Sequence, residues 1–98
     1  MTTIELGGNI KLSGFKDLEP AKLIVVKKMV GAYAKKIADK QQFQELALIM
    51  KEVHSSNFEL KANVTIEGKV LHSEMTDYNL FFAMDKVLNK LIEMVEKQ

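Results

Sequence analysis

Residues 58–67 read FELKANVTIE and alternate apolar and polar side chains from end to end. Alternation with a period of two is typical of a β-strand that has one buried face and one face in water. A turn sequence, Glu67-Gly68-Lys69, follows directly, and residues 70–75 resume an extended pattern. The two segments therefore predict a β-hairpin whose first strand leaves its polar side chains open to solvent.

Two further segments have the character of strands. Residues 46–53 are largely apolar, as in an interior strand. Near the N-terminus, apolar residues occupy four even-numbered positions, Ile4, Leu6, Ile10 and Leu12. The positions between them are mostly polar. Gly7-Gly8-Asn9 interrupts this first segment, either as a bulge within one strand or as a tight turn that pairs the strand back on itself.

Two segments predict helices. The first begins at Pro20, a residue that suits the first helical position, and its apolar side chains recur every three or four residues until Lys40-Gln41-Gln42. The second begins at Thr76-Asp77, either of which can cap free N–H groups, and its apolar stripe continues through residue 95.

The predicted order is therefore strand, helix, three strands, helix, in a single domain over residues 1–98. We expect an α+β fold of two layers, in which a four-stranded sheet carries both helices on one face. The crossover through the first helix should make the first two strands parallel.

The composition excludes several classes of protein. Apolar residues make up 47% of the 98-residue chain and charged residues 28%, which is typical of a globular protein. No apolar run approaches the roughly 20 residues of a membrane span, and no signal peptide is visible. Cysteine is absent, so we expect no disulfides, no thiolate metal site and a cytoplasmic location.

The sequence offers little for catalysis. His54 and His72 lie eighteen positions apart, which is not the spacing of a metal-ligand pair, and no Gly-x-Ser-x-Gly sequence is present. Gly7-Gly8 lacks the spaced glycines and the lysine of a phosphate-binding loop. We therefore expect no enzyme activity, no metal, no cofactor and no small-molecule substrate.

The distribution of charge is the strongest functional signal. The chain carries a net charge of +1, yet residues 16–40 alone hold seven lysines and three acids, a net charge of +4. Every one of the 14 basic residues is lysine. Lysine contacts phosphate as a point charge but lacks the planar fork with which arginine reads a guanine edge. Sequence-specific DNA recognition is therefore excluded, whereas non-specific phosphate contact is not.

Two sets of lysines are candidates for phosphate contact. On the first helix, Lys28 and Lys35 fall two turns apart on one line, roughly 10 Å from each other, with Lys27 and Lys36 beside it. On the second helix the candidates are Lys86, Lys90 and Lys97, and Glu93 has the spacing to pair with the last two. Ordinary solvation of exposed helix faces remains an alternative explanation of these lysines.

Two blocks of sequence resemble the family of ribosome hibernation-promoting factors, also known as protein Y or ribosome-associated inhibitor A. In that family a strand with a histidine leads into a helix with a spaced acid and a Lys-Leu pair, which matches His72, Ala83, Asp85, Lys90 and Leu91. The strand around Gly7-Gly8-Asn9 is similar to the family's opening strand. The absence of arginine and cysteine suggests a divergent, archaeal relative.

The resemblance implies a partner and a function. Members of the family bind the small ribosomal subunit in the channel for messenger and transfer RNA, and keep idle ribosomes inactive by occupancy. Lys90 and Lys97 match basic positions of the family's last helix, and the first-helix lysines match in kind. Glu93 departs from the pattern, and residues 1–98 have no counterpart of the second domain that pairs ribosomes in longer members. We expect a monomer or a weak dimer that binds rRNA.

Two other functions are compatible with the sequence. The first is a protein-interaction or dimerisation module that uses the open sheet face or the edge of the first strand. The second is a general double-stranded RNA-binding domain, because such domains also place two helices on one face of a sheet.

Overall fold

The alternating segment forms the strand β4 (Asn57–Ile66), whose even-numbered side chains from Leu60 to Ile66 are buried. Here the chain is described by a computed structural model that covers residues 3–53 and 56–98. A two-residue turn, Glu67-Gly68, has positive φ at both positions and leads into β5 (Lys69–Asp77), which pairs antiparallel with β4. The predicted hairpin is thus confirmed. The polar sequence His54-Ser55-Ser56-Asn57 predicts a second turn, but residues 54–55 lie outside the described residues.

Over the described residues the sheet has five strands, so the expectation of four is wrong. The N-terminal segment forms β1 (Thr3–Leu6) and β2 (Ile10–Ser13), an antiparallel hairpin, because Gly7 and Gly8 adopt φ values of 67° and 86° and reverse the chain. Glycine reaches this left-handed region at no steric cost. The tight turn is therefore correct and the bulge is not, while the α+β class and the order of the remaining elements are confirmed.

The strands follow one another across the sheet in the order β1-β2-β3-β4-β5. β3 (Glu45–Val53) lies in the centre; it pairs parallel with β2 and antiparallel with β4. The parallel pair that the crossover predicted is therefore β2 and β3. β1 and β5 form the two edges, which differ in length: β1 has 4 residues and β5 has 9.

The helices are α1 (Pro20–Lys40) and α2 (Leu80–Glu96). α1 has the predicted bounds, but α2 begins later than Thr76-Asp77 because β5 continues through Asp77. The Asp77 carboxylate accepts a hydrogen bond from the Asn79 N–H at 2.9 Å, and the Asn79 side chain accepts one from the Phe82 N–H at 3.0 Å. Asn79 is therefore the N-cap, and it satisfies a donor that the first turn would leave free.

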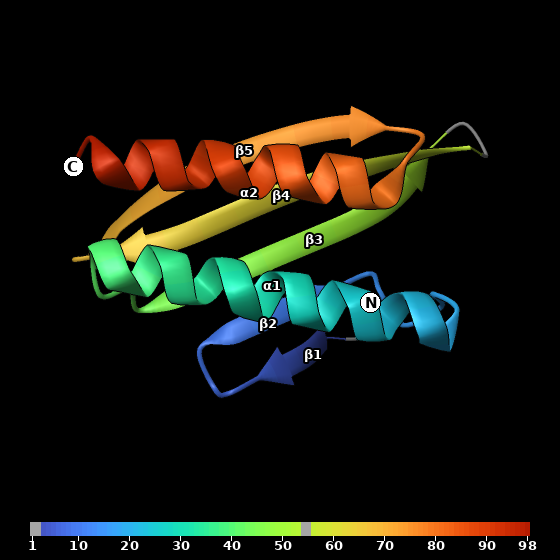
Figure 1. Ribbon diagram of the computed structural model, residues 1–98, viewed down its shortest axis with the longest axis horizontal. Coiled ribbons are helices and arrows are strands. Elements are labelled where there is room, and N and C mark those ends of the chain that lie inside the picture. The colour runs from blue at the N-terminus through green and yellow to red at the C-terminus, as the bar shows by residue number, and fades with distance from the viewer. Residues whose placement is uncertain (1–2, 54–55) are drawn as a thin grey trace.

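Both helices lie side by side on one face of the sheet and run in the same direction (Figure 1). α2 packs over β4 and β5. The side chains between the layers form one core, with Phe15, Ile37, Leu48, Leu60 and Leu91 among its members without appreciable exposure. Within the described ranges, neither helix is long and apolar enough to cross a lipid bilayer.

The chain leaves β2 through Gly14, where the backbone touches the central strand. Gly14 has a φ of 85°, and a Cβ at this position would lie 2.0 Å from the carbonyl oxygen of Met50 in β3. Only glycine fits such an approach without a shift of the backbone. The contact fixes where the loop to α1 crosses the sheet, and with it the place of the first helix.

Candidate nucleic-acid interface

The exposed positive charge of the molecule is concentrated on α1. This helix carries six lysines and a single acid, Asp39, and all six lysines are exposed. We call the four that the sequence selected, Lys27, Lys28, Lys35 and Lys36, the α1 lysine face. Because the apolar stripe of α1 is buried against the sheet, these side chains project from the helical layer into solvent.

Lys28 and Lys35 form the outer line of the α1 lysine face. Gly31 and Ala32 lie between them and are exposed, and no atom outside the helix backbone lies within 4 Å of the position that a Gly31 Cβ would take. A bulky polyanion can therefore reach the helix between the two lysines without meeting a large side chain.

Lys36 lies on the side of α1 that faces α2. Its Nζ is 5.0 Å from the centre of the Tyr33 ring, a geometry that attracts the cation to the electron-rich face of the ring. Tyr33 is itself buried, so the lysine is held over a fixed support. Because the Lys36 side chain is already ordered, it loses less conformational entropy when it binds a ligand.

A hydrogen-bonded group fixes the two helices against each other. The Tyr33 hydroxyl donates to the Asp85 carboxylate, and the Asn89 side-chain amide donates to the Tyr33 hydroxyl at 3.1 Å. Burial raises the pKa of the Tyr33 hydroxyl to about 12, with a further contribution from the bond to Asp85. Asp85, which the sequence matched to the hibernation factors, thus anchors a side chain of the neighbouring helix.

The C-terminal ends of the helices are joined as well. Lys40 forms an ion pair with Glu96 at 3.1 Å, and the Gln41 side-chain amide donates to the carbonyl of Val95 at 3.2 Å. Lys40 is therefore engaged with α2, whereas the four members of the α1 lysine face make no ion pair among the described residues.

The second set of lysines is exposed too, but its surroundings are different. Lys86 and Lys90 lie on α2 and Lys97 is its C-cap. Lys86 places its Nζ 5.2 Å from the centre of the Phe82 ring. Glu93 has the spacing to pair with Lys90 and Lys97, but neither ion pair forms in the described part of the chain. Its carboxylate therefore adds an unpaired negative charge next to these lysines.

The two sets are brought onto the same layer but not into one continuous patch. Asp85 and Glu96 contact α1, so the edge of α2 that faces the first helix carries acidic and polar side chains. Lys86 and Lys97, each one residue further along the helix, lie beyond that edge. Positive charge is therefore strongest over α1 and is diluted by carboxylates over α2.

The opposite face of the sheet carries no comparable excess of lysine within the described ranges. Two of the lysines of the sheet form ion pairs: Lys11 with Glu45 at 2.8 Å, and Lys61 with Glu59 at 3.9 Å. His72 lies in β5, where its Nδ1 is 2.5 Å from the Asn63 side-chain oxygen and its Nε2 is 3.0 Å from Glu74. His72 is therefore a strand residue that is held by local hydrogen bonds.

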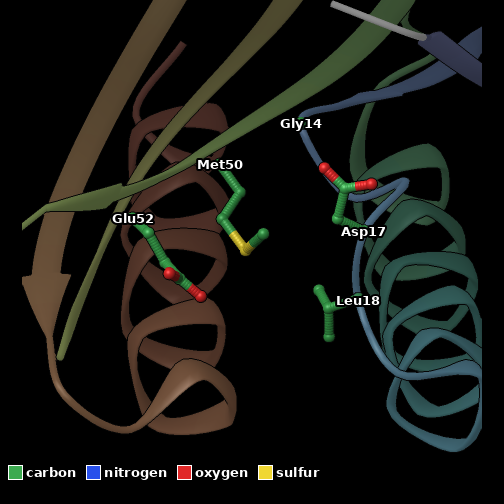
Figure 2. A pocket seen from close by; sticks show the side chains of 5 residues that line it. All are labelled: Gly14, Asp17, Leu18, Met50 and Glu52. Carbon is green, nitrogen blue, oxygen red and sulfur yellow. The ribbon is translucent and has the colours of Figure 1, made fainter. Parts of the chain in front are cut away.

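The residues that line a hollow beside Gly14 do not form a catalytic group. Figure 2 shows its lining: Asp17 and Leu18 come from the loop before α1, and Met50 and Glu52 come from β3, on the opposite wall. The two carboxylates have no histidine, lysine or hydroxyl nucleophile beside them in this lining. Across residues 3–53 and 56–98, no group of three or more His, Asp or Glu side chains is placed to hold a metal ion.

The sequence did not reveal the group formed by Tyr33, Asp85 and Asn89. Tyr33 falls on the apolar stripe of α1, and its ring alone accounts for that position. The available signal was the hydroxyl, because a buried tyrosine requires a partner for its O–H. The sequence could not say which residue, more than 50 positions away, would provide it.

Comparison of the sequence with family models finds no match, and no curated protein matches it. Solved structures do match. The N-terminal domain of Thermus thermophilus Protein Y superposes with a TM-score of 0.70 and 13% identity, covering 91% of this chain and 93% of that one. A ribosomal subunit interface protein from Coxiella burnetii gives a TM-score of 0.63 and 16% identity, covering 91% and 92%. The chain therefore has the fold of the Protein Y N-terminal domain, as the resemblance in its sequence implied.

Proposed function

We propose that this protein binds the small ribosomal subunit through the phosphates of rRNA and blocks the channel for messenger and transfer RNA. The observation that carries the proposal is the α1 lysine face, four exposed lysines on one helix that make no ion pair among the described residues, in a fold shared with a ribosomal subunit interface protein. In this proposal the protein acts by occupancy in the cytoplasm of resting or stressed cells, without catalysis.

The chemistry of the α1 lysine face suits the backbone of folded RNA. Each lysine that meets a phosphate releases condensed counterions, so that binding gains free energy and becomes sensitive to salt. Without arginine the surface has no bidentate contact to a base edge, and recognition depends on the arrangement of phosphates in space. A ribosome presents such an arrangement in a fixed form, whereas a plain duplex repeats it along its length.

The proposal is tested by co-sedimentation of the purified protein with small subunits, and separately with a plain RNA duplex, at two salt concentrations. We expect saturable binding to the small subunit that weakens as salt rises. Equal affinity for any duplex would instead identify a general double-stranded RNA-binding domain. Binding to neither RNA would refute the proposal.

A matched pair of variants locates the interface. Replacing Lys27, Lys28, Lys35 and Lys36 by glutamine removes four positive charges from the α1 lysine face. The control replaces Lys11, Lys51, Lys61 and Lys69 by glutamine, which changes the net charge equally but on the sheet. We expect loss of subunit binding for the first variant only, with the slope of log affinity against log salt reduced by roughly 3. Equal losses in both variants would rule out this site.

A further inference from the structure

β5 is a long strand whose outer edge has no neighbour among the described residues. It ends the sheet order at the side opposite β1 and lies at the margin of the molecule (Figure 1). Its 9 residues present on that side the N–H and C=O groups that β4 does not use. An edge of this length is a template for another strand unless charges, proline or a bulge protect it. β5 contains no proline and pairs with β4 in continuous register.

The sequence of β5, KVLHSEMTD, is complementary to itself when it is reversed about Ser73. In an antiparallel pair of two such strands, Lys69 lies opposite Asp77, and His72 lies opposite Glu74. Val70 then meets Thr76, and Leu71 meets Met75. Lys69 and Asp77 are of opposite sign, a ring nitrogen of His72 can donate a hydrogen bond to the Glu74 carboxylate, and side chains that share a face of the sheet remain together. Cross-strand pairs of this kind stabilise a sheet.

Other registers lack this match. If the pairing were centred on Glu74, the two carboxylates would oppose each other directly, which is unfavourable. If it were centred on His72, Lys69 would face Met75 and Val70 would face Glu74. The register centred on Ser73 is thus the one of the three that pairs opposite charges.

Ser73 provides an independent observation at the centre of this register. Its side chain is 3% exposed, and its hydroxyl is the buried side-chain polar atom without a hydrogen-bond partner among the described residues. Such a group costs free energy in the isolated chain. Directly opposed residues of an antiparallel pair bring their Cβ atoms to within about 5 Å, so two Ser73 hydroxyls can bond to each other across the pair.

We propose that two copies of this protein associate through β5, antiparallel and with the two-fold axis at Ser73, into one continuous ten-stranded sheet. The occupant of the edge is a second copy because the complementarity lies within β5 itself. The low net charge of +1 adds little repulsion between copies. The two-fold axis is perpendicular to the sheet, so both helical layers lie on the same side. This proposal does not depend on RNA binding.

The association is tested by sedimentation equilibrium over a range of protein concentrations. K69E places a carboxylate opposite Asp77 of the second copy at both ends of the interface, and we expect it to weaken dimerisation at least about tenfold. K69E/D77N removes that repulsion and keeps the side-chain oxygen that accepts from the Asn79 N–H, so it should recover part of the loss. K16E is the matched control, because Lys16 is exposed in the loop before α1 and makes no ion pair among the described residues.

The register is tested by cross-linking, which the absence of natural cysteine makes clean. V70C/T76C places two pairs of cysteines opposite each other in the dimer, while the two positions within one chain lie too far apart along the strand to bond. We expect disulfide-linked dimers from the double variant and not from V70C alone. A monomer at every concentration, a dimer that K69E leaves unchanged, or equal cross-linking by the single and double variants would each overturn the proposal.

Discussion

The hydroxyl of Tyr33 donates a hydrogen bond to the carboxylate of Asp85, and this contact joins the middle of α1 to the first half of α2. Tyr33 thereby serves two structures at once, since its ring also supports Lys36. The orientation of the α1 lysine face relative to α2 depends on a side chain that is itself part of the core.

The first prediction concerns the ionisation of Tyr33. In the variant Y78F it is the only tyrosine, and its alkaline titration can be followed by the ultraviolet absorbance of tyrosinate. We expect a midpoint at about 12, because burial and the bond to Asp85 both disfavour the phenolate. D85N removes the negative charge and should lower that midpoint. A midpoint near 10, the ordinary value, would show that the hydroxyl is neither buried nor bonded to Asp85.

The same pKa shift predicts how stability depends on pH. A raised pKa in the folded state stabilises the protein fully below the unfolded value of about 10, and this contribution is lost as pH rises toward 12. The unfolded chain then releases its proton first, so the free energy of unfolding falls across that interval by at most about 3 kcal/mol. Y33F should remove this part of the pH dependence in urea unfolding measured between these two pH values.

The second prediction concerns Gly14. G14A should destabilise the protein by at least about 2 kcal/mol, because its Cβ would meet the Met50 carbonyl oxygen and its φ is positive. Thermal unfolding followed by circular dichroism measures the loss. G8A is the control, since Gly8 has a similar φ of 86° but open space around it. It should cost about 1 kcal/mol, and a loss as large as that of G14A would mean that backbone strain alone explains both.

The third prediction concerns the start of α2. N79A should cost about 1 kcal/mol, because it removes the side-chain oxygen that accepts from the Phe82 N–H. N79D keeps an acceptor at the N-terminus of the helix and should retain most of the stability. Equal unfolding temperatures for N79A and the unmodified protein would show that another residue caps the helix.

The fourth prediction compares the two sets of lysines. K28Q/K35Q/K36Q and K86Q/K90Q/K97Q remove the same charge from α1 and α2 respectively. The first variant should lower affinity for the small subunit about tenfold or more and the second by less, because Asp85, Glu93 and Glu96 offset the positive potential over α2. Co-sedimentation at low salt measures both. A larger loss from the α2 variant would move the interface to the second helix.

Most of the fold could be predicted because its main strands and helices each show one clear period of apolar residues. The alternation in β4 and the Glu67-Gly68 turn determine a hairpin from local sequence alone, and the apolar stripe of α1 has no competing period. The N-terminal segment did not determine its own pairing, because glycine permits both a bulge and a turn. The strand count was wrong at that point because Gly7 and Gly8 have no side chains whose pattern could distinguish the two.

The candidate site could be predicted only in part. The exposure of a lysine follows from the pattern of its own helix, whereas the residues that lie near it depend on how the helices pack. The spacing of Lys28 and Lys35 follows from helix geometry, and the structure places both on the surface. The carboxylates that separate α1 from the lysines of α2 could not be foreseen. Which edge of each helix faces the other depends on packing against the sheet, and the sequence of either helix leaves that open.

The parallel course of α1 and α2 has an electrical consequence (Figure 1). Two antiparallel helices side by side would cancel their macrodipoles, whereas these two add, with the positive ends at Pro20 and Leu80. Lys40 and Lys97 lie at the negative ends and stabilise them. The helix dipoles thus polarise the protein along the helical axes. The number of lysines on each helix does not show this asymmetry. A polyanion that approaches the helical layer therefore meets a gradient of potential that orients the molecule before any contact forms.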